Sequence, residues 1–216
     1  MIEAVLFDLD GVIVDTEQVW DDVREQLVRE RGGRWHDGAQ AAMMGMSSPE
    51  WSSYMHDALG MTESPEELND EMVRRMLARY RDDLPLIDGA VEAVRRLAAE
   101  FPLAVASSSN RLLIEAVLEG AGIADRFRVV VSSEEVARGK PAPDVYLEAA
   151  RRLEVAPARC AAVEDSSNGI RSAHAAGMRV LALPNAHYPP APDALALADA
   201  VLSSPEELTV ELLDAP

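Results

Sequence analysis

Short hydrophobic runs alternate with amphipathic segments along most of the chain. Short runs of this kind are typical of buried strands, and the amphipathic segments are typical of helices. The predicted strands are Ala4–Leu9, Leu103–Ala106, Val129–Ser132, Cys160–Val163 and Val180–Leu183, with a weaker sixth at Ala200–Leu202. The predicted helices between them include Ala90–Glu100, Leu112–Gly120, Val145–Leu153 and Ile170–Ala176. This alternation predicts an α/β fold: a parallel sheet with helices on both faces.

One long segment, from about Asp15 to Leu86, interrupts the alternation because it contains no strand pattern. It opens with an expected helix of mixed polarity, Asp15–Arg31. Two helix starts follow, each with a capping serine, a proline in the first turn and an acid near the positive helix end. They are Ser48-Pro49-Glu50 and Ser64-Pro65-Glu66-Glu67, and Ser204-Pro205-Glu206-Glu207 repeats the pattern near the C-terminus. We therefore expect an all-helical cap domain, residues 15–86, inserted into an α/β core of residues 1–14 and 87–216.

Two acids, Asp8 and Asp10, follow the first predicted strand and precede Gly11. Residues i and i+2 of a strand point the same way, so the two carboxylates are expected side by side at the sheet edge. Gly11 allows a sharp turn close to a ligand. Paired carboxylates in this setting suit a hard divalent cation, or a nucleophile beside an acid/base group. The alternative is a polar strand end that makes a solvated turn.

Other polar clusters follow three more predicted strands. Ser107–Arg111 offers hydroxyls and helix-start amides, as an anion site does, although a helix cap would need only one such residue. Lys140 lies in a Gly-Lys-Pro-Ala-Pro-Asp turn, where a surface lysine is the alternative. Glu164 and Asp165 follow the fourth strand, where a helix cap is the alternative. Ligands bind beyond the carboxyl ends of parallel strands. Together the clusters predict a cation site beside an anion site, which suits Mg²⁺ next to a phosphate.

Net charge and cysteine content indicate which classes of partner and which cellular setting suit the chain. The formal net charge of −18 argues against nucleic acid or an anionic membrane as partner, and it means that local cations must attract an anionic substrate. The single cysteine, Cys160, lies in an apolar run and fits a buried, inert thiol in a reducing, cytoplasmic setting. No apolar stretch reaches membrane-spanning length, and the start does not resemble a signal peptide.

Four motifs in order resemble those of the haloacid dehalogenase superfamily. They are Asp8-Leu9-Asp10-Gly11-Val12, Ser107 after a strand, Lys140 in its Pro-rich turn, and Glu164-Asp165-Ser166. The resemblance covers nearly the whole chain and is greatest for the phosphatase and β-phosphoglucomutase branch. It implies a Rossmann-like core with a helical cap inserted after the first strand. Dehalogenating members lack a carboxylate at the position of Asp10, so phosphoryl transfer is favoured.

The resemblance also implies residue roles. Asp8 would attack phosphorus, and Asp10 would protonate the leaving alcohol and then deprotonate water. Mg²⁺ would be held by Asp8, the backbone carbonyl of Asp10 and Asp165, with Glu164 as a ligand or close by. Ser107 would bind a phosphoryl oxygen, and Lys140 would neutralise charge. Further substrate or phosphate contacts are expected from Gly11, Ser108, Asn110 and Arg111.

The cap leaves the reaction open. β-Phosphoglucomutase has a cap-loop arginine where Ser48 stands here and a histidine where Trp20 stands, and both differences count against mutase activity. Methionines 43, 44 and 46, with Trp51 and Tyr54, form either an apolar substrate pocket or the cap core. We expect a Mg²⁺-dependent phosphatase acting on a small phosphorylated metabolite, as a monomer or small homo-oligomer. The alternatives are a phosphomutase and a non-catalytic binding protein.

Overall fold

The computed structural model describes residues 1–44, 46–185 and 188–214. A single parallel sheet organises the chain, with strand order β3-β2-β1-β4-β5-β6. The strands are β1 Ala4–Phe7, β2 Leu103–Ser107, β3 Phe127–Ser132, β4 Cys160–Glu164, β5 Arg179–Ala182 and β6 Ala200–Val201. β1 lies between β2 and β4. All three strands are buried along their length, and they are apolar except at the carboxyl ends of β2 and β4, where Ser107 and Glu164 stand. The predicted α/β fold is confirmed.

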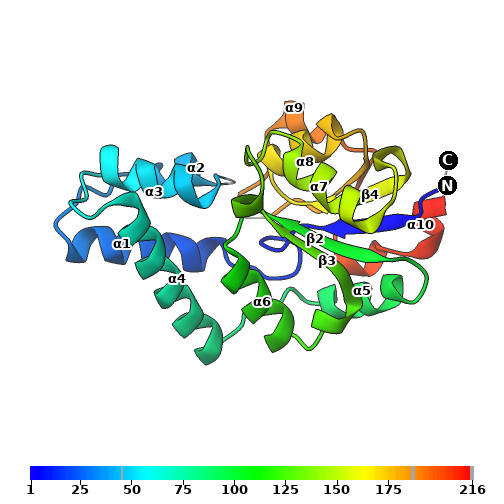
Figure 1. Ribbon diagram of the computed structural model, residues 1–216, viewed down its shortest axis with the longest axis horizontal. Helices are drawn as coiled ribbons and strands as arrows, with labels where there is room; N and C mark the ends of the chain where they lie inside the picture. Colours follow the sequence, from blue (N-terminus) through cyan, green and yellow to red (C-terminus); the bar gives the residue numbers. More distant parts are fainter. Residues whose placement is uncertain (45, 186–187, 215–216) are drawn as a thin grey trace.

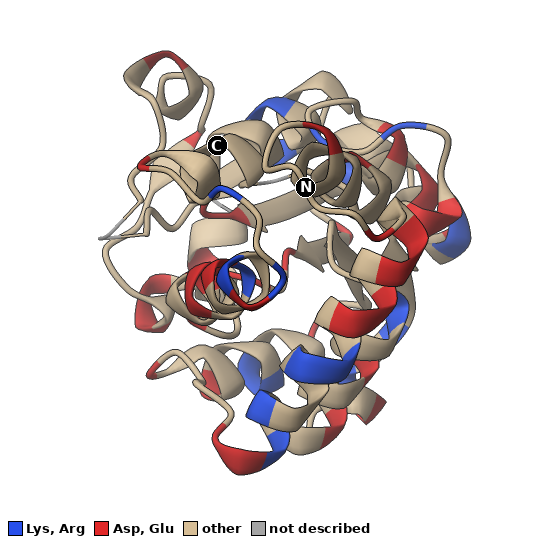
Figure 2. Ribbon diagram, turned by 90° about the vertical axis from the view of Figure 1, so that its left-hand side faces the viewer, with Lys and Arg blue, Asp and Glu red and all other residues tan. Residues whose placement is uncertain are grey.

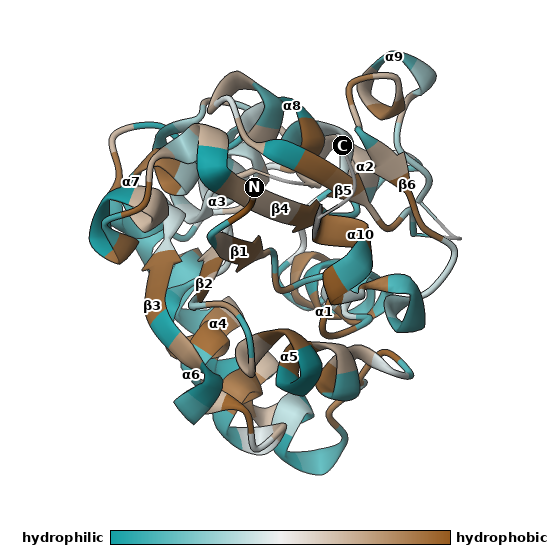
Figure 3. Cartoon of the chain, turned by 90° about the vertical axis from the view of Figure 1, so that its right-hand side faces the viewer, coloured by the Kyte–Doolittle hydropathy of each residue, from teal (hydrophilic) through white to brown (hydrophobic). Residues whose placement is uncertain are grey.

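Helices cover both faces of the sheet (Figure 3). On one face α7 (Asp144–Leu153) and α8 (Ser167–Ala175) bury their apolar sides against the alternating small residues of β1, β2 and β4. On the other face lie α5 (Ala90–Ala98), α6 (Arg111–Gly120) and α10 (Val210–Asp214). The remaining short elements are α9 Pro192–Leu195, η1 Ala124–Arg126, η2 Ser133–Glu135, η3 Pro157–Arg159 and η4 Pro205–Glu207.

The interrupting segment is helical throughout its named elements. It contains α1 Glu17–Glu30, α2 Ala39–Met43, α3 Ser48–Asp57 and α4 Pro65–Asp82, which lie together at one end of the molecule, coloured blue to cyan in Figure 1. Their packing buries a continuous apolar cluster that includes Leu27, Met55 and Met72. We propose that residues 15–86 form the cap domain, and residues 1–14 and 87–216 the core domain.

Local differences from the sequence prediction have simple causes. β1 ends at Phe7 rather than Leu9, because the Leu9 carbonyl accepts hydrogen bonds from the amides of residues 12–14 and draws the chain out of the sheet. The cap of α3 is Ser47 rather than Ser48, since Glu50 is then the third helical residue and closes a capping box. Ser64 caps α4 as predicted, while Ser204 precedes only the short η4.

Acidic residues are spread over the surface. In the view of the cap end, red acidic segments lie on most helices with blue basic segments between them (Figure 2). Within the described residues, no helix combines the length and the apolar character needed to cross a bilayer.

Candidate active site

The polar clusters predicted at the strand ends come together at the carboxyl edge of the sheet. Asp8 follows the central strand β1, and Glu164 is the last residue of the neighbouring β4. The loop after β3 brings in Lys140, and the loop after β2 brings in Ser108 and Ser109. One cleft is lined by these core residues and by residues of the cap; its empty volume is about 540 Å³, part of it open solvent.

Lys140 joins two of the acids. Its Nζ lies 3.0 Å from Asp8 Oδ2 and 2.6 Å from Glu164 Oε1, and its side chain is 1% exposed. Burial opposes the charged form most strongly, but the carboxylates of Asp8 and Glu164 together raise the pKa of Lys140 above its ordinary value. The lysine is therefore a fixed cation at neutral pH. The alternative of a surface turn lysine is wrong for this residue, which is the only lysine of the sequence.

Both carboxyl oxygens of Glu164 accept hydrogen bonds from neighbouring groups. Oε1 accepts hydrogen bonds from Lys140 and from the Tyr146 hydroxyl at 2.8 Å, and Oε2 accepts from the amides of Asp165 and Ser166. Gly169 leaves the room for this carboxyl group, because a Cβ there would lie 1.8 Å from Oε1. Both carboxyl oxygens of Glu164 thus already accept hydrogen bonds from the protein. These contacts suit Glu164 to the role of positioning Lys140.

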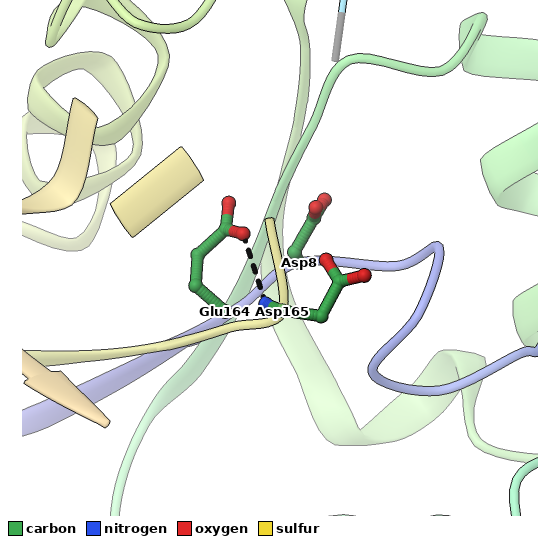
Figure 4. Close-up of side chains that lie close together, drawn as sticks. All are labelled: Asp8, Glu164 and Asp165. Carbon is green, nitrogen blue, oxygen red and sulfur yellow. Dashed lines mark hydrogen bonds between the residues drawn. The ribbon is translucent and has the colours of Figure 1, made fainter. Parts of the chain in front are cut away.

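Three carboxyl groups could hold a cation. One oxygen from each of Asp8, Glu164 and Asp165 lies within 4.8 Å of the others (Figure 4). Asp8 Oδ1 and Asp165 Oδ2 are buried and have no hydrogen-bond partner in the described part of the chain. Such unpartnered anionic oxygens are costly unless a cation compensates them. An all-oxygen donor set fits a hard divalent ion such as Mg²⁺.

The electrostatics of the acids show the same need for positive charge. Burial raises the pKa of Asp8 to about 8, although Lys140 acts in the opposite direction. Burial, then the charges of Glu164 and Asp8, raise the pKa of Asp165 well above its ordinary value. A bound cation would favour the ionised form of both groups.

Gly11 makes the approach of the first loop possible. Its φ is +75°, a conformation that suits glycine, and a Cβ at this position would lie 1.9 Å from Asp165 Oδ2. Any side chain here would displace the Asp165 carboxyl group. Gly11 therefore shapes the carboxylate cluster, whereas the sequence assigned it to substrate contact.

Asp10 is oriented by two hydroxyl groups. The Thr16 hydroxyl donates a short hydrogen bond to Asp10 Oδ1, and the Ser109 hydroxyl donates to Oδ2 at 2.6 Å. Ser108 and Ser109 line the cleft, whereas Ser107 is fully buried and its Oγ accepts from the Ser109 amide at 3.0 Å. The serine cluster thus contributes both to the cleft wall and to the placement of Asp10.

Asn110 and Arg111 lie apart from these groups. Asn110 Nδ2 donates to Asn69 of α4 at 2.9 Å and to Glu134 at 2.6 Å, so this side chain ties the core to α4. The Arg111 guanidinium donates to Glu115 and to the Val130 carbonyl of β3. Neither is among the residues lining the cleft. Their substrate roles stay predictions that the geometry does not favour.

The cap supplies the opposite wall of the cleft. The wall consists of Glu17, Trp20, Arg24, Met43, Met44, Met46 and Trp51. The three methionines and Trp51 therefore line the cleft, and Met43 and Trp51 also belong to the buried core of the cap. Tyr54 is not part of the wall, and its hydroxyl lies 3.3 Å from His36.

The cap touches the core beside Lys140. A Cβ on Gly139 would lie 3.0 Å from the Ser47 side chain, and Asn168 Nδ2 donates to the Met44 carbonyl at 3.4 Å. The cap loop therefore rests on two core loops that flank the carboxylates. The cap thus lies over one side of the cleft, in the position expected for a lid.

Sequence reasoning missed several residues that the fold brings to the site. Thr16 and Tyr146 orient Asp10 and Glu164, and Glu17 lines the cleft from α1. Thr16 and Glu17 directly follow the first loop in sequence, which was a usable signal. The sequence contains no such signal for Tyr146, because an aromatic residue on the apolar side of a helix usually belongs to the hydrophobic core.

Comparison with known proteins agrees with this geometry. The sequence model of the haloacid dehalogenase-like hydrolases matches residues 2–177. Hexitol phosphatase B of Escherichia coli strain K12 is 32% identical over 233 residues, which covers 97% of this chain and 96% of the relative. The bifunctional riboflavin kinase/FMN phosphatase of Arabidopsis thaliana is 32% identical over 215 residues, or 99% of this chain, and the chain spans 56% of that relative.

A solved structure has the same fold over the whole chain. CbbY from Rhodobacter sphaeroides, in complex with phosphate, superimposes with a TM-score of 0.88 at 27% identity, and each chain is fully covered. The chain belongs to the haloacid dehalogenase-like hydrolase family. With its phosphatase relatives, this makes it a phosphoric monoester hydrolase. The family resemblance and the enzyme class predicted from the motifs are confirmed.

Proposed function

We propose that the protein is a Mg²⁺-dependent phosphatase that hydrolyses a small phosphorylated metabolite, such as a sugar phosphate, through an aspartyl phosphate on Asp8. The observation that carries the proposal is the position of Lys140, 3.0 Å from Asp8 Oδ2 in a cleft that Asp10 also lines. A carboxylate beside a fixed cation can approach a phosphate dianion with less repulsion. The hexitol phosphatase relative supports a sugar phosphate as substrate.

The proposed reaction has two steps. Asp8 attacks phosphorus, the bond from phosphorus to the ester oxygen breaks, and Asp10 gives its proton to the leaving alcohol. Asp10 then takes a proton from water, the water oxygen attacks phosphorus, the bond between phosphorus and the Asp8 oxygen breaks, and inorganic phosphate leaves. The two hydroxyls on Asp10 hold its carboxyl group in place for both transfers. The proton that Asp10 loses in the first step returns in the second.

The carboxylates of Asp8 and Asp165 would hold Mg²⁺, with Glu164 beside them. When bound, the ion would draw negative charge from the phosphoryl oxygens. Lys140 fixes the other side of Asp8 and stays charged throughout. Ser108 lines the cleft, where its hydroxyl would donate to a phosphoryl oxygen, whereas the Ser109 hydroxyl donates to Asp10.

Activity should require Mg²⁺ and be blocked by excess Ca²⁺. Ca²⁺ prefers more oxygen ligands at longer distances, so it should bind the same carboxylates and displace Asp8 from its attacking position. Phosphate release from a panel of phosphorylated metabolites, measured with Mg²⁺, with chelator and with added Ca²⁺, checks this. Undiminished activity in a strong chelator would contradict the metal requirement.

The products should show hydrolysis rather than a mutase reaction. Ser48 offers no cation at the place of the mutase arginine, and a hydroxyl binds a dianion less firmly than a bidentate guanidinium. With β-glucose 1-phosphate, Mg²⁺ and a priming sugar bisphosphate, we expect free phosphate or no reaction. Efficient glucose 6-phosphate formation in a coupled assay would select the mutase alternative.

The third alternative, a non-catalytic binding protein, is set aside because the family match defines a hydrolase and every motif acid and Lys140 is present. A monomeric or small homo-oligomeric state and a cytoplasmic location stay predictions.

A further inference from the structure

Arg24 is a buried cation that the proposed hydrolysis does not use. It lies on α1 in the cap, it is 5% exposed, and it lines the same cleft as Asp8 and Lys140. Its guanidinium carbon stands 4.6 Å from the centre of the Trp20 ring and 5.4 Å from that of Trp51. The two indoles hold the guanidinium by cation–π contact, so its position is fixed before any ligand arrives.

The charge of Arg24 is incompletely matched. Nη1 donates to Gln40 Oε1 at 2.8 Å, and Gln40 Nε2 lies 3.2 Å from Glu17 Oε2, so a neutral amide separates the guanidinium from the nearest acid. Nε is buried without a hydrogen-bond partner among the described residues, and no ion pair of Arg24 occurs there. A buried cation in this state is costly unless an anion joins it.

The Arg24 side chain stays positively charged at neutral pH. Burial lowers the pKa of Arg24 to about 10, although Glu17 and Asp10 oppose the shift. Burial and then the charge of Asp10 raise the pKa of Glu17 to about 7, so Glu17 compensates Arg24 only in part. A positive charge that is only partly compensated therefore lies on the cap wall of the cleft.

The two cations of the cleft have separate tasks. Among its described lining residues, the basic ones are Lys140 and Arg24. Lys140 is bound to Asp8 and Glu164 at the sheet edge, where the phosphoryl group would react. A second anionic group on the substrate would meet Arg24 on the opposite wall. In a chain with a formal charge of −18, a local cation of this kind is needed to attract such a group.

We propose that Arg24 is a specificity-determining residue that selects phosphomonoesters whose leaving alcohol carries a second anionic group, a carboxylate or a further phosphate. This inference rests on the proposed phosphatase function. The unpartnered Nε–H group can donate a charge-assisted hydrogen bond to either group, and the contacts with the two indoles hold the guanidinium in place before the ligand binds.

The test compares matched esters that differ by one distal anionic group. The pairs are phosphoglycolate with ethyl phosphate, 6-phosphogluconate with glucose 6-phosphate, and fructose 1,6-bisphosphate with fructose 1-phosphate. For at least one pair the wild type should prefer the anionic member in kcat/KM by ~10- to 100-fold, the range of a charge-assisted hydrogen bond. Arg24→Met should bring that ratio near 1, chiefly by raising KM for the anionic member. Arg24→Lys should restore part of it. The first two pairs report a carboxylate, and the third a phosphate.

Arg74→Met is the matched control, because Arg74 lies on α4 of the cap, pairs with Glu71 and does not line the cleft. It removes the same charge and should leave every ratio unchanged. A wild-type preference for the neutral members, or an Arg24→Met variant that loses activity equally on both members, would overturn the inference. The second result would assign Arg24 a structural role in the cap.

A binding measurement separates this inference from the proposed function. The same ligand pairs are titrated against fluorescence of the tryptophans, since Trp20 and Trp51 contact Arg24. If the wild type with Mg²⁺ hydrolyses no ester, including p-nitrophenyl phosphate, the proposed function fails. Tighter binding of the anionic member to wild type than to Arg24→Met would still support the inference, and equal binding would overturn it.

Discussion

Replacing Asp8 with asparagine should abolish turnover while the protein stays folded. The Asp8 carboxylate is the nucleophile candidate that stands beside Lys140 at the end of the central strand. An amide oxygen of the same shape can still accept the hydrogen bond from Lys140 but attacks phosphorus poorly. We expect kcat to fall by ~10⁴-fold or more, as for removal of other enzymic nucleophiles. Phosphate release by purified Asp8→Asn, with circular dichroism as the folding control, checks the result.

The same variant should be at least as stable as wild type when no divalent ion is present. Burial raises the pKa of Asp8 from 3.8 to about 8, so the unfolded chain releases this proton at lower pH than the folded chain does. Ionisation then favours unfolding, and the contribution of Asp8 to stability falls as pH rises from about 4 to about 8. Asparagine removes this dependence. Unfolding temperatures in chelator across this pH range test it, and a lower value for Asp8→Asn at pH 7 would contradict it.

Replacing Lys140 with methionine should reduce both rate and stability. The variant loses the cation beside the reacting phosphoryl group, and removal of one such electrostatic contact typically costs ~3 kcal/mol of transition-state stabilisation, or ~100-fold in kcat. It also leaves the carboxylates of Asp8 and Glu164 buried without their partner, which typically costs ~3–5 kcal/mol of folding free energy. Kinetics at a temperature where the variant is fully folded, with denaturant titrations, separate the two effects.

Arg138→Met is the control for Lys140→Met. Arg138 lies in the same loop and carries the same charge, but its exposed side chain pairs with Asp144 at the surface. Its removal should change the free energy of unfolding by no more than ~1 kcal/mol and leave kcat unaltered. If Lys140→Met behaved like Arg138→Met in both measurements, Lys140 would have no special role.

Much of the fold and site was predictable because the chemistry lies at strand ends. Two apolar runs each predict a buried strand, and the acids that follow them mark where each strand ends. These acids are Asp8 and Asp10 after the first run, and Glu164 and Asp165 after the second. Parallel pairing then brings these strand ends together regardless of sequence separation. The helix start at Ser64 was visible for a similar reason, since capping is local chemistry, and the start of α3 was predicted one residue late, at Ser48 instead of Ser47.

The orientation of side chains was not predictable from such patterns. The sequence placed Lys140 in a turn at the predicted site, but only the fold shows that its side chain is buried between two carboxylates. Asn110 and Arg111 belong to the same motif segment as Ser108, yet the first turn of α6 directs them toward Glu134 and Glu115. The surroundings of Arg24 were not predictable either, because the pairing of Trp20 with Trp51 beside it depends on contacts between α1 and α3.

The covalent intermediate on Asp8 can be observed directly. The wild type is mixed with a substrate and Mg²⁺, quenched in acid within milliseconds, reduced with borohydride and digested for mass spectrometry, with Asp8→Asn treated in parallel. An aspartyl phosphate is reduced to homoserine, so we expect homoserine at position 8 in the wild type and no reduced residue in Asp8→Asn. Reduction at another carboxylate, or none during steady turnover, would contradict a nucleophilic role for Asp8.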